Sequence, residues 1–167
     1  SSTEIAVVDA GALAMVDFSQ HSKRTVLTPH AGELAALLNR LGQQTSRIEV
    51  EAEPAQAALL AANLTDCHVL LKGSFNFLAS PNQKIRAIGP LSAHLATAGT
   101  GDVLAGALGA LLAANHEAVL KSEQVFLDVI ELGVELHSRA AELASSDGPV
   151  SALDVAQMLR KAIAEIS

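Results

Sequence analysis

The chain has 167 residues and a formal net charge of −7, because 18 acidic side chains outnumber 11 basic ones. This charge repels phosphodiester backbones and anionic lipid surfaces, so neither nucleic acid nor a membrane is an expected partner. Aromatic residues make up only 2% of the chain, so the core must pack from aliphatic side chains and base stacking is not expected. The length fits one domain over residues 1–167, and we expect a soluble, cytoplasmic protein.

The first half of the chain alternates short apolar runs with helical patterns. Residues 5–8 and 25–28 are apolar runs that end at an aspartate and a proline, which is typical of buried parallel strands. Leucines at helical spacing predict a helix over 32–40, and an alanine-rich stretch predicts another over 53–64. This alternation favours an α/β fold with functional groups at the carboxyl ends of the strands.

The second half begins with strands and then becomes helical. A strand over 68–72 precedes a predicted hairpin of 74–79 with 84–88. The predicted helices cover residues 102–114, 122–145 and 151–166. Ser151 with Asp154 three residues later is typical of a helix cap. No repeat or low-complexity linker marks a second domain.

Glycines and a lone cysteine lie inside predicted elements. Gly106 and Gly109 each cost the helix roughly 1 kcal/mol relative to alanine, so we expect close packing of this helix against the sheet or another helix. Cys67 precedes a predicted buried strand and is expected to be an inert core thiol. Four further histidines without partners at a convincing spacing are predicted to be surface or structural residues: His21, His94, His116 and His137.

A glycine-rich segment leads into the helix that Asp102 begins. Gly99, Thr100 and Gly101 precede Asp102, so backbone N–H groups and the positive end of the helix converge on a point that suits an anion. Asp102 could accept a proton from a hydroxyl held beside that anion, and Thr97 borders the same point. The alternative is a glycine-rich turn with an acidic helix start.

The end of the third predicted strand carries a lysine followed by small and polar residues. These residues are Lys72, Gly73, Ser74, Phe75 and Asn76. They lie at the edge where an open α/β sheet places its ligand, and one positive charge with several hydrogen-bond donors suits a nucleotide phosphate. The alternative for so short a pattern is a strand-ending lysine in solvent.

Two other strand ends carry ionisable side chains. If a helix begins at Ala31, His30 and Glu33 share one face and one cleft. Glu33 is also well placed at a positive helix end, and a His-x-x-Glu pair without a third ligand is a weak metal motif. Asp9 points into the same crevice, where it positions substrate or a magnesium-bound phosphate or else caps a helix.

Five segments resemble one protein family in their order and spacing. They are residues 7–13 (VVDAGAL), 26–34 (VLTPHAGEL), 69–74 (VLLKGS), 95–106 (LATAGTGDVLAG) and 152–155 (ALDV). From residue 7 to about residue 163, the chain is similar to the ADP/ATP-dependent NAD(P)H-hydrate dehydratases. The resemblance implies a ribokinase-like, three-layer αβα fold with a mostly parallel central sheet, here without the N-terminal part of the family domain.

The resemblance also implies a reaction and a set of site residues. The reaction is the dehydration of hydrated NADH or NADPH, driven by phosphoryl transfer from ADP or ATP with Mg²⁺. Asp102 is then the catalytic base, with His30, Glu33 and Asp9 also at the substrate. The implied nucleotide-binding residues are Lys72, Gly73, Ser74, Phe75, Asn76, Thr97, Gly99, Thr100 and Gly101, with the amides of the last two holding the transferred group. No residue is assigned as a metal ligand, and we expect a homo-oligomer.

Three positions depart from the family pattern. Asn76 stands where threonine is usual, Ala31 where proline is usual, and Gly11 where a second aspartate is usual. One hydroxyl and one carboxylate are therefore missing from the implied site. Two other functions stay open: a ribokinase-like small-molecule kinase acting on a vitamin precursor or sugar, and a non-catalytic remnant that binds nucleotide.

Overall fold

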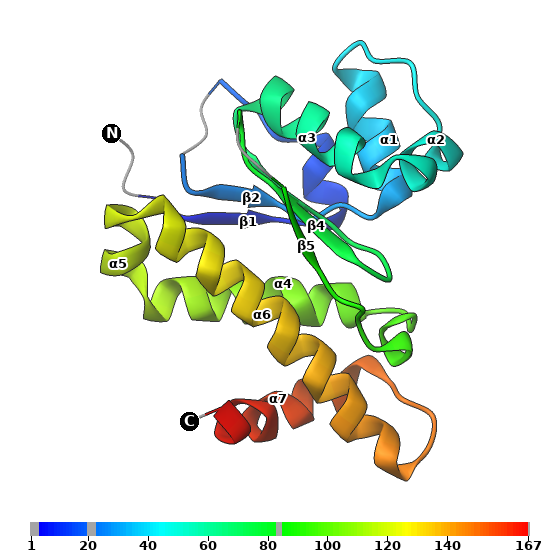
Figure 1. Ribbon diagram of the computed structural model, residues 1–167, viewed down its shortest axis with the longest axis vertical. Helices are drawn as coiled ribbons and strands as arrows, with labels where there is room; N and C mark the ends of the chain where they lie inside the picture. The colour runs from blue at the N-terminus through cyan, green and yellow to red at the C-terminus, as the bar shows by residue number, and fades with distance from the viewer. Residues whose placement is uncertain (1–3, 20–22, 83–84, 167) are drawn as a thin grey trace. The chain divides into compact units, whose positions relative to one another are not determined.

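The computed structural model describes residues 4–19, 23–82 and 85–166 (Figure 1). The chain divides into two units, residues 1–87 and residues 88–167, each with its own dense set of internal contacts. The single ribokinase-like domain over residues 1–167 stays a prediction.

A five-stranded sheet forms the centre of the first unit, and its last strand ends one residue beyond residue 87. Its strands are β1 (Ala6–Val8), β2 (Thr25–Leu27), β3 (His68–Leu71), β4 (Asn76–Ala79) and β5 (Arg86–Ile88), in that order across the sheet. Strands β1, β2 and β3 are parallel, and β4 is antiparallel to β3. The predicted strands are confirmed, and β4 and β5 are sheet neighbours, although Gln83 and Lys84 of the hairpin lie outside the described residues. The carboxyl ends of β1, β2 and β3 therefore share one edge.

The helices of the first unit cover one side of this sheet (Figure 1). They are the 3-10 helix η1 (Ala10–Ala14), α1 (Ala31–Arg40), α2 (Arg47–Ala52) and α3 (Pro54–Thr65). The core between helices and strands is aliphatic, with Leu27, Leu34 and Val69 fully buried. Cys67 is buried in this core, and desolvation raises the pKa of its thiol to about 12, as expected for an inert thiol.

Helix α2 is an element that sequence periodicity did not predict, because six residues are too few to show a helical repeat. Its start nevertheless has a signature in the sequence. The Ser46 hydroxyl accepts from the Glu49 N–H at 3.3 Å, and the Glu49 carboxylate accepts from the Ser46 N–H at 2.7 Å. The Ser46 hydroxyl also donates to the Glu49 carboxylate at 2.8 Å, and this bond, together with the one from the Ser46 N–H, lowers the pKa of Glu49. The Ser-x-x-Glu capping box is the signal that could have revealed the helix.

The second unit is helical. Its elements are η2 (Ala93–Leu95), α4 (Thr100–Ala114), α5 (His116–Lys121), α6 (Glu123–Ala144), η3 (Ser145–Asp147) and α7 (Ala152–Ile166), with α6 packed against both α4 and α7. The predicted cap of α7 is confirmed, because the Asp154 carboxylate accepts from the Ser151 N–H at 2.9 Å. Among the described residues, none of the helices has the length and apolar character needed to cross a membrane.

The two glycines of α4 have no close neighbours within the second unit. A Cβ added at Gly106 or Gly109 would meet no described atom of that unit within 4 Å, so the predicted close packing on a neighbouring helix is wrong at these positions, and close packing on the sheet stays a prediction. The close contact lies at Gly133 on α6, where a Cβ would come within 2.6 Å of Leu108 Cδ2 and 3.2 Å of Leu111 Cδ1. The missing side chain of Gly133 therefore makes room for leucines of α4.

We expect opposite effects from alanine at two of these glycines. Gly133→Ala should lower the free energy of unfolding by roughly 1–2 kcal/mol, because its methyl group overpacks the fully buried Leu108. Gly106→Ala should raise it by roughly 0.5–1 kcal/mol, because alanine restricts the unfolded chain and meets open space. Urea denaturation of the whole chain measures both values. Equal effects of the two substitutions would contradict the packing of α4 on α6.

Candidate functional site

Three polar side chains follow the three parallel strands of the first unit. Asp9 follows β1, Thr28 follows β2 and Lys72 follows β3, so all three lie at one edge of the sheet. The Lys72 ammonium donates to Asp9 Oδ1 at 2.6 Å, and the Thr28 hydroxyl donates to the same oxygen at 2.8 Å. The Asp9 and Lys72 side chains are only 12% and 18% exposed. Asp9 thus links the ends of three strands. It accepts a hydrogen bond from Thr28 and forms an ion pair with Lys72 that solvent screens little.

Asp9 precedes η1 but makes no side-chain cap to it. The predicted alternative of a helix N-cap is therefore wrong for Asp9, since its Oδ1 atom accepts hydrogen bonds from Thr28 and Lys72 instead.

The backbone just beyond the strands is held by hydrogen bonds as well. A parallel bridge joins His30 and Lys72, and the Lys72 N–H donates to the Pro29 carbonyl at 2.8 Å. Lys72 is consequently fixed in both backbone and side chain.

His30 is the N-cap of α1, which begins at Ala31 as the predicted cleft requires. Its Nδ1 accepts from the N–H groups of Gly32 at 3.0 Å and Glu33 at 3.2 Å. The Glu33 carboxylate accepts in return from the His30 N–H at 2.8 Å, and His30 Nε2 lies 3.5 Å from Glu33 Oε1. Because Nδ1 acts as the acceptor, Nε2 carries the ring hydrogen. The exposed imidazole can therefore donate one hydrogen bond to a ligand.

The loop after β3 separates its residues into exposed and buried ones. Gly73, Ser74 and Phe75 are exposed, whereas Asn76 is buried. The Asn76 Oδ1 atom accepts from the Gly73 N–H at 3.0 Å and closes the turn between them. Asn76, which stands at the family's threonine position, therefore shapes the loop from within, and any nucleotide contact of its side chain stays a prediction.

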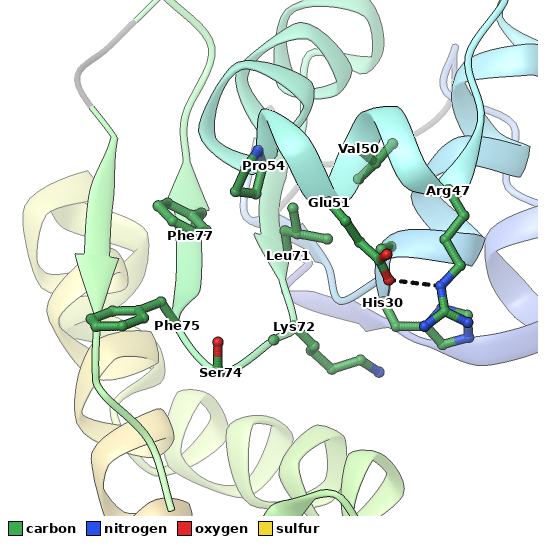
Figure 2. Close-up of a pocket in the computed structure, with 12 residues that line it drawn as sticks. His30, Arg47, Val50, Glu51, Pro54, Leu71, Lys72, Ser74, Phe75 and Phe77 are labelled. Atoms are coloured by element: carbon green, nitrogen blue, oxygen red, sulfur yellow. Dashed lines mark hydrogen bonds and ion pairs between the residues drawn. The ribbon is translucent and has the colours of Figure 1, made fainter. Parts of the chain in front are cut away.

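A cavity of about 700 Å³ lies beside this loop (Figure 2). Its lining residues are His30, Ala31, Arg47, Val50, Glu51, Pro54, Leu71, Lys72, Gly73, Ser74, Phe75 and Phe77. The structure thus brings His30 together with the predicted loop residues from Lys72 to Phe75. Sequence reasoning missed Arg47 and Glu51, which form an ion pair of 2.7 Å at the cavity. Their spacing of four residues on a capped helix was the available signal.

Glu33 and Asp9 do not line this cavity. Glu33 lines a second cavity of about 280 Å³, together with Leu37 and Arg40 among others. Both carboxylate oxygens of Glu33 also face His30. Direct contact of Glu33 or Asp9 with substrate stays a prediction.

The remaining predicted residues lie at the start of α4 in the second unit. Gly99 is the residue before the helix and has a left-handed φ of 86°, which glycine adopts without strain. The Thr100 hydroxyl donates to the Leu95 carbonyl at 2.7 Å and to the Thr97 carbonyl at 2.8 Å. The Thr100 N–H also donates to the Thr97 carbonyl, at 3.3 Å. Thr100 therefore holds the turn, and contact of its amide with a phosphoryl group stays a prediction.

Asp102 is exposed in the first turn of α4, and the helix begins without a side-chain cap. The N–H groups of Gly101 and Asp102 belong to the positions that have no partner within a helix. An anion placed there would meet these donors and the positive end of the helix dipole. An anion site at this helix start, with the Asp102 carboxylate beside it, stays a prediction.

Three of the four histidines predicted to be surface or structural residues are described, and none of the three lines either cavity. His94 and His116 are exposed and His137 is buried. His21 lies outside the described residues. Within residues 4–19, 23–82 and 85–166, no three His, Cys, Asp or Glu side chains gather as a metal-binding group.

Comparison with solved structures identifies the fold. The structure resembles a ribokinase-like superfamily protein from Enterococcus faecalis, with a TM-score of 0.66 and 19% identity over 98% of this chain and 54% of that one. It also resembles the ADP/ATP-dependent NAD(P)H-hydrate dehydratase from Bacillus subtilis co-crystallised with ATP and Mg²⁺, with a TM-score of 0.76 and 24% identity. That match covers 96% of this chain and 55% of the other. The predicted ribokinase-like α/β fold is confirmed.

The family model for NAD(P)H-hydrate dehydratase matches residues 1–164. The chain belongs to the NAD(P)H-hydrate dehydratase family, as its five sequence segments predicted. The bifunctional NAD(P)H-hydrate repair enzyme Nnr from Corynebacterium glutamicum is 31% identical over 189 residues, which cover 99% of this chain and 33% of that protein. The chain thus spans a third of this relative and little more than half of the Bacillus subtilis one.

Proposed function

We propose that this chain dehydrates hydrated NADH or NADPH in a reaction driven by ADP or ATP. The observation that carries the proposal is the start of α4, where the exposed Asp102 carboxylate lies beside helix N–H groups that no side chain caps. Family membership supports the choice of substrate. The direct test is the nucleotide-dependent return of NADH from its hydrate, and phosphorylation of a small alcohol instead would favour a kinase.

The chemistry needs a base and an anion site. The ring hydroxyl of the hydrate is a poor leaving group, so its oxygen first attacks the terminal phosphorus of ADP or ATP, and the shortened nucleotide leaves. Asp102 takes the hydroxyl proton in this step. Phosphate then departs with the electrons of the C–O bond while the adjacent ring carbon loses a proton, which restores the dihydropyridine ring. One phosphoanhydride bond is broken for each hydrate repaired.

The transferred group is held by backbone amides in this proposal. The Gly101 N–H, in the first turn of α4, is proposed for this role, with Gly99 and Thr97 beside it. For the Thr100 N–H to contact the transferred group as predicted, its hydrogen bond to the Thr97 carbonyl would have to break. Stabilising charge that develops on transferred oxygens is the main contribution of such donors.

The loop after β3 is proposed to hold the nucleotide. Lys72 has three N–H donors, and Asp9 uses one of them, so two are available to a phosphate. The exposed Gly73 and Ser74 add further polar groups at the same cavity. The ion pair with Asp9 keeps the ammonium group oriented before the nucleotide arrives.

Mg²⁺ would neutralise charge on the phosphates when bound. The described residues form no metal-binding cluster of their own. In this proposal the ion is carried mainly by phosphates and water, because Mg²⁺ commonly takes only one or two carboxylates from a protein. Asp9 is the carboxylate proposed to contact a magnesium-bound phosphate. A homo-oligomer and a cytoplasmic location stay predictions.

His30 is proposed to bind the hydrate through its Nε2 hydrogen. We expect His30→Asn to weaken hydrate binding about tenfold and to leave ADP affinity nearly unchanged, because one hydrogen bond is lost. Asparagine keeps the N-cap, since its side-chain oxygen can accept from the same N–H groups. Calorimetric titration with the hydrate and with ADP measures both affinities.

The matched control for His30 is His30→Ala, which removes the cap as well. This variant should show the same loss of hydrate affinity and a further loss of about 1 kcal/mol in stability. Equal weakening of ADP and hydrate in His30→Asn would move His30 to the nucleotide site. Unchanged affinity for both ligands would leave it as a helix cap only.

A further inference from the structure

Aromatic side chains gather at the cavity beside β3. The chain has four phenylalanines and no tryptophan or tyrosine, and two of the four, Phe75 and Phe77, line this cavity. Phe126 is fully buried, and Phe18 lies under the Arg40 guanidinium, 5.2 Å from its ring centre. Low aromatic content argued against base stacking, yet half of the aromatic rings meet at one place.

Phe75 is fixed in position without being part of the core. The hydrogen bond between the Gly73 N–H and the buried Asn76 Oδ1 closes the turn that carries Phe75. The residue is 43% exposed, so much of its ring is free to meet a ligand. Because the loop is already ordered, binding against this ring would cost little conformational entropy. Phe75 therefore has the properties of a stacking surface.

The cavity has an apolar side and a polar side. Figure 2 shows Phe75 and Phe77 on one side and the Arg47–Glu51 ion pair with His30 on the other, with the Lys72 side chain extending toward the polar side. The volume of about 700 Å³ lies in the range of small-molecule sites. A ligand that suits this cavity carries a planar ring at one end and anionic groups at the other. A nucleotide has this layout.

We propose that Phe75 stacks on the adenine ring of a nucleotide whose phosphates reach Lys72. This inference rests on the proposed function and adds to it the residue that recognises the base. Stacking on an aromatic face is a sufficient mode of recognition for a purine, because it uses the whole ring. The adenine comes either from the ADP or ATP donor or from the adenine half of the hydrated dinucleotide.

Titration of the full chain with three probes tests the stacking. The probes are ADP, NADH and inorganic pyrophosphate, which has the phosphates without the base. Phe75→Ala should raise the Kd of the adenine ligand that uses this site by about tenfold or more and leave pyrophosphate unchanged. Phe75→Trp should bind like the native chain, whereas Phe75→Leu, which keeps apolar bulk but has no ring, should be as weak as Phe75→Ala.

Leu64→Ala is the matched control, because Leu64 is 41% exposed on α3 and does not line the cavity. It should change none of the three affinities. Weakening of ADP alone assigns the stacked base to the donor, and weakening of NADH alone assigns it to the dinucleotide. Native ADP and NADH affinity in Phe75→Ala, or full binding by Phe75→Leu, overturns the stacking and leaves the proposed function intact. A native chain that binds none of the probes overturns both.

Discussion

Asp102→Asn is expected to slow dehydration of the hydrate by ~10²–10⁴-fold, the range typical for loss of a general base. Asparagine keeps the size and shape of the side chain and removes its ability to take the hydroxyl proton. Because Asp102 is exposed, the melting temperature should hardly change. The measurement is the rate at which NADH absorbance returns from the purified hydrate with saturating ADP or ATP.

The control for Asp102 is Glu123→Gln, which neutralises a first-turn carboxylate of α6 in the same unit. Both variants remove a first-turn charge that favours a helix N-terminus, so a loss of activity common to both would not be specific to Asp102. Only Asp102→Asn should lose activity. Near-native turnover in Asp102→Asn would show that the carboxylate has no part in proton transfer, and a large fall in melting temperature would indicate a structural role.

Removal of the Lys72 charge is expected to have the largest effect on stability. Lys72→Met leaves the Asp9 carboxylate without its cation at a site only 12% exposed, which should lower the free energy of unfolding by about 2–4 kcal/mol. The double variant Asp9→Asn, Lys72→Met should recover most of this loss, because no charge is then left alone. Urea denaturation of both single variants and the double variant gives the coupling energy.

Lys121→Met is the matched control, because it breaks an ion pair whose partners are 76% and 88% exposed. It should have little effect on stability, as is usual for exposed pairs. Titration with ADP distinguishes the structural role of Lys72 from its binding role. The double variant should regain the stability lost in Lys72→Met but not the affinity for ADP. A Lys72→Met chain as stable as the native one, or a double variant no more stable than Lys72→Met, would contradict the buried ion pair.

The strands and most helices could be predicted because their signals are local. The apolar runs before Asp9 and Pro29 and the leucine spacing after Gly32 depend only on neighbouring residues, and the structure places β1, β2 and α1 there. The short helix α2 has too few residues for periodicity, although its Ser46–Glu49 capping box was visible. Gly133 could not be singled out, because its role depends on which leucines of α4 meet it.

The sequence indicated which residues belong to the candidate site, but it did not show which of them contact one another. Asp9 and Lys72 were both recognised at strand ends, but their pairing across 63 residues follows from the strand order, which composition and periodicity do not supply. The buried role of Asn76 is likewise a matter of how one loop folds. Phe75 was predicted to bind nucleotide as part of its loop but not to stack on a base, since an average aromatic content does not tell where the few rings gather.

The measurement that tests the central claim most directly is the conversion of purified NADH hydrate to NADH by this protein. We expect NADH to appear only when ADP or ATP is present together with Mg²⁺, with one phosphate released for each NADH formed. The return of NADH absorbance and the released phosphate are followed in the same sample. Phosphorylation of a small alcohol with the hydrate left unchanged, or nucleotide binding with no turnover of the hydrate, would contradict the proposed function.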